Sequence, residues 1–163
     1  MNIIIDACSV INLYNAQCLG RVCHLQDHEF WIGPIALGEC SGACAAEVWN
    51  LIQSGLIAQL QEGEIDGERY LDLLDELGLG PGETECIAAA EVLGFSVCTD
   101  DGLARRAALD LLGEDRRLGT ARLLQWSVIE RIMDCGEANE RFTLMKLEGG
   151  YLPTLVQGFF CGA

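Results

Sequence analysis

Five acidic side chains stand where apolar segments of this chain end or begin, and together they could bind a divalent metal ion. Asp6 ends one apolar run, and the pair Asp100 and Asp101 ends another. Glu39 and Glu85 each lie near the start of an apolar helical stretch. Carboxylates that converge with no basic partner repel one another unless a cation lies between them. Oxygen ligands of this kind suit Mg²⁺ or Mn²⁺.

Apolar segments that alternate with helical patterns must position these acids. Short strands separated by helices predict an α/β fold with a parallel sheet, and such folds gather their sites at the carboxyl edge of the sheet. The strands are expected at residues 2–5, 29–33, 56–60 and 95–99. The helices are expected at residues 7–19, 34–55, 67–77, 83–93, 103–112, 120–133 and 137–147. The stretch 115–118 is too polar for a fifth strand and predicts a loop. The apolar tail 151–163 is expected to dock on the body of the protein or on another subunit.

Each acid also has an ordinary structural interpretation. Glu83 and Glu85 would lie in the first turn of a helix, where the helix dipole favours negative charge. The acidic pair after residue 99 could be an N-cap and a first-turn acid. Glu39 has apolar neighbours in the sequence, and Asp6 follows a strand of three isoleucines. Neither of these last two acids has an equally clear structural explanation.

Composition limits the class of protein. Half of the 163 residues are apolar, which is too many for a disordered chain, and the length suits one domain. No apolar run reaches the ~18 residues of a membrane span, and the first residues lack the features of a signal peptide. We therefore expect a soluble, cytoplasmic protein without a membrane partner.

The net charge of −15 disfavours a general nucleic-acid binder, which normally has a basic face. Half of the ten basic residues nevertheless follow the acidic pair in one short stretch, at Arg105, Arg106, Arg116, Arg117 and Arg122. They could form a solvated helix face. Alternatively, they form a rim that guides an anion such as RNA to the acids, with Arg105 and Arg106 nearest to them in the sequence.

Nine cysteines could indicate disulfides or a zinc site. Their odd number and the lack of a secretory signal argue against a disulfide framework. The nearest approach to a metal pattern contains no Cys-x-x-Cys spacing. It consists of Cys18, Cys23, His24 and His28, followed by Cys40 and Cys44. Since free cysteine in an apolar segment behaves as a small hydrophobe, we expect buried thiols.

Two segments of the chain resemble the signatures of one prokaryotic branch of the PIN-domain nucleases. The first is Gly-Glu-Thr-Glu-Cys-Ile-Ala-Ala-Ala at 82–90, and the second is Thr-Asp-Asp-Gly-Leu-Ala-Arg at 99–105. Leu-Gly-Thr at 118–120 and Gly-Tyr-Leu-Pro at 150–153 are also similar to that branch. The resemblance spans nearly the whole chain.

This resemblance implies a three-layer α/β/α fold with a central, mostly parallel sheet and a metal-dependent ribonuclease site. Residues 1–135 would form the nuclease domain, and residues 136–163 a C-terminal helix and apolar tail that pack on it. The site would bind Mg²⁺ or Mn²⁺ and cleave single-stranded RNA. Many small PIN proteins are VapC-type toxins, which implies an antitoxin partner and a homodimer.

The resemblance also implies roles for individual residues. Asp6, Glu39, Glu85 and Asp101 match the acidic quartet of the family, and Asp100 competes with Asp101 for the fourth position. Two further residues match auxiliary positions: Ser9 matches a small hydroxyl residue after the first aspartate, and Glu83 matches an additional acid.

One other function is compatible with the sequence, and two further functions fit it poorly. A PIN-like module that binds a protein without catalysis would suit the charge of −15 and the apolar tail at 159–161. A phosphohydrolase with an aspartyl nucleophile normally has a second acid two residues after the first, and that position is Cys8. A response-regulator receiver is also unsuitable, because its paired acids precede the strand-end aspartate.

Overall fold

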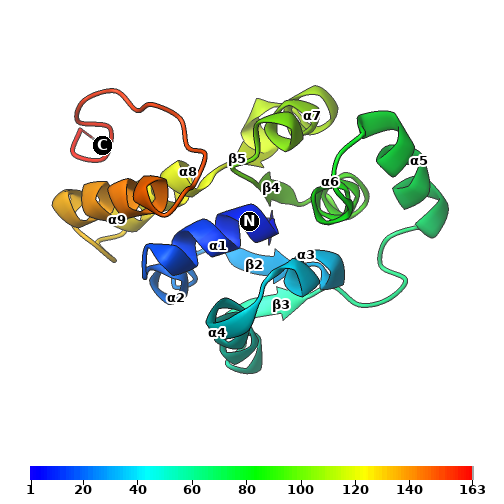
Figure 1. The fold of residues 1–163 in the computed structure, drawn as a ribbon, viewed down its shortest axis with the longest axis horizontal. Helices are drawn as coiled ribbons and strands as arrows, with labels where there is room; N and C mark the ends of the chain where they lie inside the picture. The colour runs from blue at the N-terminus through cyan, green and yellow to red at the C-terminus, as the bar shows by residue number, and fades with distance from the viewer. Residues whose placement is uncertain (163) are drawn as a thin grey trace.

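A five-stranded sheet forms the centre of residues 1–162, the part of the chain that the computed structural model describes (Figure 1). Its strand order is β3-β2-β1-β4-β5, and every pair of neighbours is parallel. The strands are β1 (Asn2–Ile5), β2 (Glu29–Ile32), β3 (Ile57–Gln59), β4 (Ser96–Cys98) and β5 (Arg117–Leu118). The predicted α/β fold is confirmed.

The central strand β1 is apolar because helices cover both faces of the sheet. Ile3, Ile4 and Ile5 are all buried. A strand of a parallel sheet reads as a continuous apolar run, rather than an alternating one, when neither of its faces reaches water. In the register of the sheet, Ile4 lies opposite Trp31 of β2 and Val97 of β4.

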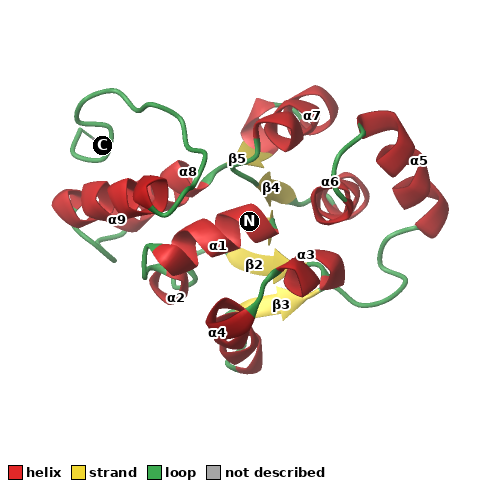
Figure 2. Cartoon of the chain, in the orientation of Figure 1, coloured by secondary structure: helices red, strands yellow, loops and turns green. Residues whose placement is uncertain are grey.

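The helices form the two outer layers of a three-layer α/β/α arrangement (Figure 2). On one face, α6 contacts β1 and β4, α7 packs beside α6, and α5 covers the outside of α6. On the other face, α1 packs against α2, α8 and α9, while α4 flanks the edge strand β3. The helices are α1 (Ala7–Asn15), α2 (Leu19–Val22), α3 (Pro34–Glu39), α4 (Gly42–Gln53), α5 (Gly67–Leu77), α6 (Pro81–Leu93), α7 (Gly102–Leu112), α8 (Thr120–Ile129) and α9 (Cys135–Leu147).

Three of the predicted helices are wrong in extent, because residues with positive φ interrupt them. The helix expected at 7–19 ends at Asn15, since Gln17 has a φ of 55° and turns the chain before α2. The helix expected at 34–55 is two helices, because Cys40 and Ser41 are extended and Gly42 has a φ of 54°. The helix expected at 120–133 ends at Ile129, before Arg131 with a φ of 61°.

The predicted loop at 115–118 was wrong, because this segment contains the edge strand β5 after a short 3₁₀ turn, η1 (Glu114–Arg116). Val97 and Cys98 of β4 pair with its two residues. The polar side chain of Arg116 supports this pairing, since its Nε donates a hydrogen bond of 3.0 Å to the carbonyl oxygen of Phe95. The helix expected at 67–77 is confirmed without change.

The C-terminal segment beyond α9 packs on the body without forming a helix or strand within residues 151–162. Phe160 is buried and meets the ring of Phe142 of α9 edge to face. The argument against disulfides is wrong at one place, because Cys135 and Cys161 form a disulfide. The expected buried thiols are confirmed at six positions: Cys18, Cys23, Cys40, Cys44, Cys86 and Cys98. Over the described residues, no helix has both the length and the apolar character needed to cross a membrane.

Candidate functional site

The order of the strands reverses between β1 and β4. From β1 the chain moves through β2 to β3 on one side, and it then returns to β4 and β5 on the other side. A crevice outside the carboxyl ends of the strands at such a point is where open α/β sheets bind their ligands. Asp6 directly follows β1, and Thr99, Asp100 and Asp101 directly follow β4. The structure thus brings the first and last of the predicted acids to the same part of the sheet edge.

Asp6 is buried, and the charged group that affects its pKa, Glu83, is also an acid. Its carboxylate is 1 % exposed, and its Oδ2 accepts hydrogen bonds of 2.9 Å from both Cys8 Sγ and Thr99 Oγ1. Burial raises the pKa of Asp6 and exceeds the lowering effect of these two bonds, while the charge of Glu83 raises it further. Within the described residues, no Lys, Arg or His side chain forms an ion pair with Asp6.

Next to Asp6 lies a cavity of about 330 Å³, which we call the acidic cavity. Four carboxylate residues line it, at Glu83, Asp100, Asp101 and Glu148, and none of its lining residues is basic. The other lining residues are Cys8, Ile11, Asn12, Asn15, Gly149, Gly150 and Tyr151. Cys8 connects the cavity to Asp6, because it lines the cavity and donates to the Asp6 carboxylate.

Asp100 and Asp101 differ in how many of their two carboxylate oxygens accept hydrogen bonds from the protein. Asp100 accepts at both oxygens: Oδ1 from the amide of Thr120, and Oδ2 from Asn12 Nδ2 and Thr120 Oγ1, at 2.8–3.0 Å. Asp101 is the N-cap of α7, and both of its bonds go to Oδ1, from the amides of Leu103 and Ala104. Its Oδ2 receives no hydrogen bond from the described part of the chain.

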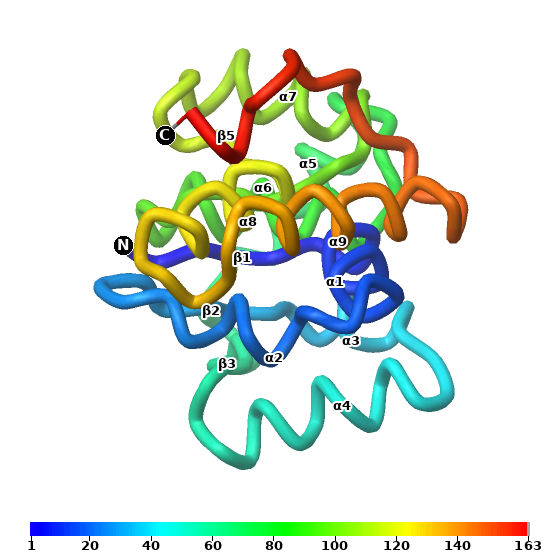
Figure 3. Tube along the Cα trace, turned by 90° about the vertical axis from the view of Figure 1, so that its left-hand side faces the viewer, coloured from blue at the N-terminus to red at the C-terminus, as the bar shows by residue number. Residues whose placement is uncertain are grey.

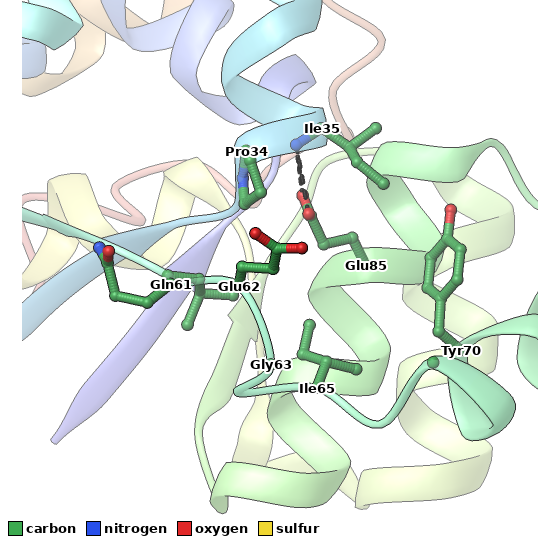
Figure 4. A pocket seen from close by; sticks show the side chains of 10 residues that line it. Pro34, Ile35, Gln61, Glu62, Gly63, Ile65, Tyr70 and Glu85 are labelled. Atoms are coloured by element: carbon green, nitrogen blue, oxygen red, sulfur yellow. Dashed lines mark hydrogen bonds between the residues drawn. The ribbon is translucent and has the colours of Figure 1, made fainter.

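The two glutamates of the first turns of α6 face different cavities. Glu83 lines the acidic cavity, and its Oε2 accepts from the amide of Gly80, the N-cap of α6. Glu85 lines a second cavity of about 180 Å³ (Figure 4). Its Oε2 accepts from the amides of Ile35 and Ala36 at 3.0 and 3.1 Å, so that it caps the start of α3.

The second cavity is mainly apolar, and we call it the apolar cavity. Tyr70 and Ile65 form part of its wall, and the carboxylates of Glu62 and Glu85 face into it (Figure 4). Burial raises the pKa of Glu85 despite its bonds from Ala36 and Ile35, and the charge of Glu39 raises it further.

Glu39 lies beside Glu85 rather than in the acidic cavity. Its side chain is exposed, so the expectation that it lacks a surface explanation was wrong. Two glycines make room for this pair of acids. A Cβ at Gly82 would lie 2.6 Å from Glu39 Oε1, and a Cβ at Gly33 would lie 2.0 Å from Glu85 Oε2. Any larger residue at these positions would displace a carboxylate.

Cys86 is a buried thiol of α6, and acids of the predicted site affect its pKa. The pKa of Cys86 is raised well above its ordinary value by burial first, and then by the charges of Asp6, Glu85 and Glu39. The predicted acids therefore surround the start of α6, but in two groups. Asp6, Glu83, Asp100 and Asp101 lie on the side of the acidic cavity, and Glu39 and Glu85 lie on the other side.

The three remaining predicted residues do not line the acidic cavity. Ser9 is fully buried, and its Oγ lies 3.9 Å from Sγ of Cys8. Arg105 donates through Nη1 to the carbonyl oxygens of Thr99 and Leu118, at 3.1 and 2.9 Å. It thereby joins the ends of β4 and β5. Arg106 is exposed on α7 and forms no ion pair within the described residues.

Four residues of the site were not predicted. Thr99 and Thr120 donate to Asp6 and Asp100, and both stand within the motifs that carry the family resemblance. Asn12 lies one helical turn after Ser9, so a polar face on an otherwise apolar helix was the available signal. No sequence pattern pointed to Glu148, because its position at the cavity depends on how α9 runs back to the edge of the sheet.

The residues of the acidic cavity suit a hard divalent ion in donor chemistry. Over residues 1–162, no three His, Cys, Asp or Glu side chains are arranged to hold a metal ion together. Oδ2 of Asp101 nevertheless accepts no hydrogen bond from the described residues, and Oδ1 of Asp6 accepts none from a side chain. An oxygen-only set that lacks a cationic partner matches the preference of Mg²⁺ and Mn²⁺.

Comparison with protein-family models, with curated proteins and with solved structures gives no match. The chemistry of the site rests on its own residues: carboxylates that gather at the reversal of strand order, with a raised pKa at the most deeply buried one.

Proposed function

We propose that this chain is a PIN-like ribonuclease that uses Mg²⁺ or Mn²⁺ to cleave single-stranded RNA. One observation carries the proposal. Asp6 and Asp101 follow adjacent parallel strands at the reversal of strand order, beside a cavity lined by four carboxylates and no basic residue. Such a cavity repels a free phosphate, and a bound cation reverses this preference.

Asp6 and Asp101 would hold the metal ion, with Glu83 as an auxiliary acid at the same cavity. When bound, Mg²⁺ or Mn²⁺ lowers the pKa of a water molecule and stabilises negative charge on a phosphate. Glu39 and Glu85 form the second group of acids, across the start of α6. The hydrogen bonds support Asp101 rather than Asp100 as the ligand, because of the two only Asp101 keeps an oxygen that accepts no hydrogen bond from the described residues.

The residues around the acids orient them before substrate arrives. Thr99 and Cys8 fix the carboxylate of Asp6 through Oδ2, which leaves Oδ1 for a ligand. Asn12 and Thr120 fix Asp100, whose segment forms the wall of the cavity. Groups held in this way by a rigid sheet edge need little reorganisation during catalysis.

A cleavage assay with purified protein tests the proposal. The wild type should cleave a fluorescently labelled single-stranded RNA when Mn²⁺ is present, and a chelator should stop the reaction. Asp6→Asn should abolish cleavage, because it removes a charged ligand while keeping the shape of the side chain. The matched control is Asp75→Asn, which changes an exposed aspartate on α5 and should leave cleavage intact. Full activity in Asp6→Asn would overturn the proposal.

A protein-binding role without catalysis is the second candidate. Tyr151 is 96 % exposed and Val156 is 75 % exposed on the C-terminal segment, and both are apolar surfaces that a partner could cover. A metal ion that binds only the folded state must stabilise it, by ~2.7 kcal/mol at a concentration of about a hundred times Kd. A melting temperature that Mn²⁺ does not change would therefore favour this second function.

The toxin–antitoxin role and the homodimer also remain proposals. If the chain is a toxin, its induced expression should arrest growth, and Asp6→Asn should relieve the arrest. Light scattering of the purified protein distinguishes a monomer from a dimer. An antitoxin would be recognised as a protein that suppresses both the growth arrest and RNA cleavage.

A further inference from the structure

A third cavity, of about 200 Å³, lies on the other side of Asp100, and we call it the basic cavity. Three arginines from three elements line it: Arg105 of α7, Arg117 of β5 and Arg122 of α8. The chain has only ten basic residues and a net charge of −15. Three guanidinium groups against two carboxylates, those of Asp100 and Glu114, therefore give the lining of this cavity a positive balance.

Two acids line the same cavity, but neither neutralises the arginines fully. Both oxygens of Asp100 already accept hydrogen bonds from Asn12 and Thr120. Glu114 pairs with Arg117 through a side chain that is 67 % exposed. Ion pairs that water reaches in this way contribute ~0–1 kcal/mol and compete weakly with a better ligand.

The arginines are partly fixed before any ligand binds. Arg105 is tied to the ends of β4 and β5 through the carbonyl oxygens of Thr99 and Leu118. Gly119 lets its guanidinium approach the backbone, because a Cβ there would lie 2.5 Å from Arg105 Nη1. Arg117 has a buried Nε without a hydrogen-bond partner in the described chain. A preorganised guanidinium loses less entropy when it binds a phosphate.

The apolar part of the lining comes mainly from the C-terminal segment. Pro153, Leu155 and Phe159 contribute to it, and Figure 3 shows the course of this segment from the end of α9 to the C-terminus. Gln125 Nε2 donates to the carbonyl oxygen of Phe159 at 3.5 Å, and the Cys135–Cys161 disulfide anchors the end of the tail. One cavity thus has a charged side for a phosphate and an apolar side for a sugar or base.

We propose that the basic cavity binds one nucleotide unit of single-stranded RNA, with its phosphate on Arg117 and Arg122 and its base against the tail. This inference rests on the proposed ribonuclease function and extends it. Since Asp100 forms a wall of both cavities, a strand bound here continues directly over the acids. Binding of an RNA strand then does not depend on the overall charge of the protein.

Fluorescence anisotropy with a labelled short oligouridylate, in the presence of a chelator, tests this separately from cleavage. Arg122→Gln and Arg117→Gln should each raise Kd about tenfold, as expected for the loss of a charge-assisted hydrogen bond. Each should also reduce the salt dependence of binding by roughly one phosphate contact. The matched control is Arg131→Gln, which removes the same charge from an exposed position outside the cavity and should change Kd less than twofold, as expected for a screened charge.

Competition identifies the ligand. Uridine monophosphate should displace the labelled RNA, and uridine without a phosphate should not. Inorganic phosphate should compete much more weakly than the nucleotide, because it cannot contact the apolar wall. Equal weakening by Arg131→Gln and Arg122→Gln would overturn the proposal, and so would equal competition by inorganic phosphate and uridine monophosphate. Because no metal is present, this result stands whether or not Asp6→Asn abolishes cleavage.

Discussion

The acidic and basic cavities share the wall at Asp100 but use their charged groups in opposite ways. Four carboxylates line the acidic cavity with no basic residue among them, and three guanidinium groups line the basic cavity. Around the acidic cavity, Asp101 keeps one oxygen that accepts no hydrogen bond from the described residues, and Asp6 keeps one that accepts none from a side chain. In the basic cavity, Arg105 is committed to two backbone carbonyls.

This difference shows how an acidic protein can handle a polyanion. The acidic cavity needs a cation before it can accept a phosphate, whereas the basic cavity can bind a phosphate without one. The segment after β4 serves both, because Thr99 bonds Asp6 on one side and Arg105 on the other. Mutations that separate the two cavities therefore test the comparison.

The largest difference between two variants is expected at the adjacent residues Asp100 and Asp101. Asp101→Asn keeps an N-cap oxygen for α7 but removes the charge, so we expect cleavage to fall by about a hundredfold or more, with little change in stability. Asp100→Asn places an amide where Asn12 and Thr120 donate, so we expect a loss of ~1–3 kcal/mol of stability from unsatisfied donors. Cleavage assays and urea unfolding of both variants measure this. The reverse pattern would exchange the roles of the two residues.

The disulfide should have the next largest effect, and mainly on the basic cavity. It closes a separation of 26 residues, so its loss in a Cys135→Ser, Cys161→Ser double variant should cost ~3 kcal/mol of stability. RNA binding in the presence of a chelator should weaken, because the tail supplies the apolar wall of the basic cavity. Urea unfolding and anisotropy check both expectations. A double variant of buried thiols far from the tail, Cys40→Ala with Cys44→Ala, is the control for RNA binding. Unchanged RNA affinity without the disulfide would mean that the tail does not form part of the binding site.

A single methyl group at the shared wall should disturb both cavities. Gly119→Ala would place a Cβ 2.5 Å from Arg105 Nη1 and 3.0 Å from Asp100 Oδ1, so that Arg105 must leave its carbonyl partners. The φ of −149° at Gly119 suits alanine, which makes the effect purely steric. We expect ~1–3 kcal/mol of destabilisation and weaker RNA binding. The control is Gly102→Ala, which meets open space and should be neutral or slightly stabilising. Equal stability of the two variants would show that Arg105 is free to move.

The sequence predicts the parts of the fold that depend on local pattern. Ile3, Ile4 and Ile5 require a strand with two covered faces, and a parallel sheet then brings Asp6 to the segment after β4. The break before Gly42 and the edge strand β5 were missed because each depends on distant contacts or on a single backbone angle. Neither leaves a periodic signal in the sequence.

Most acids around the two cavities were named from the sequence, but Glu148 and the division of the acids into two groups were not. Asp6 and Asp101 meet at one sheet edge, as their positions after parallel strands require. Glu83 and Glu85 are two residues apart on α6, and residues with this spacing do not share a helix face. Their separation into two cavities was therefore available from the sequence. The hydrogen bonds that distinguish Asp100 from Asp101 were not, because Asn12 and Thr120 come from helices far away in the chain.

The smallest expected effect is a pH dependence of the free energy of unfolding, and it arises from Asp6 beside the acidic cavity. Burial raises the pKa of Asp6 above its ordinary value of 3.8, and the charge of Glu83 adds to this rise. The folded state therefore holds this proton more tightly than the unfolded state does. The stabilisation of the folded state by this bound proton is complete below pH 3.8, and it is lost as the pH rises through the raised pKa of Asp6 in the folded state.

Asp6→Asn removes this titration, so the comparison with the wild type isolates it. In the presence of a chelator, the stability of the variant relative to the wild type should increase from pH 4 toward neutral pH and then become constant. Glu91 and Glu137 titrate with lowered pKa values beside Arg69 and Arg21, but they contribute equally to both proteins and cancel. Urea unfolding over this pH range measures the difference, with Asp75→Asn as the variant that should show none. A difference that does not vary with pH would mean that Asp6 is ionised as easily as an exposed aspartate, and the acidic cavity would then lose its distinction from ordinary surface.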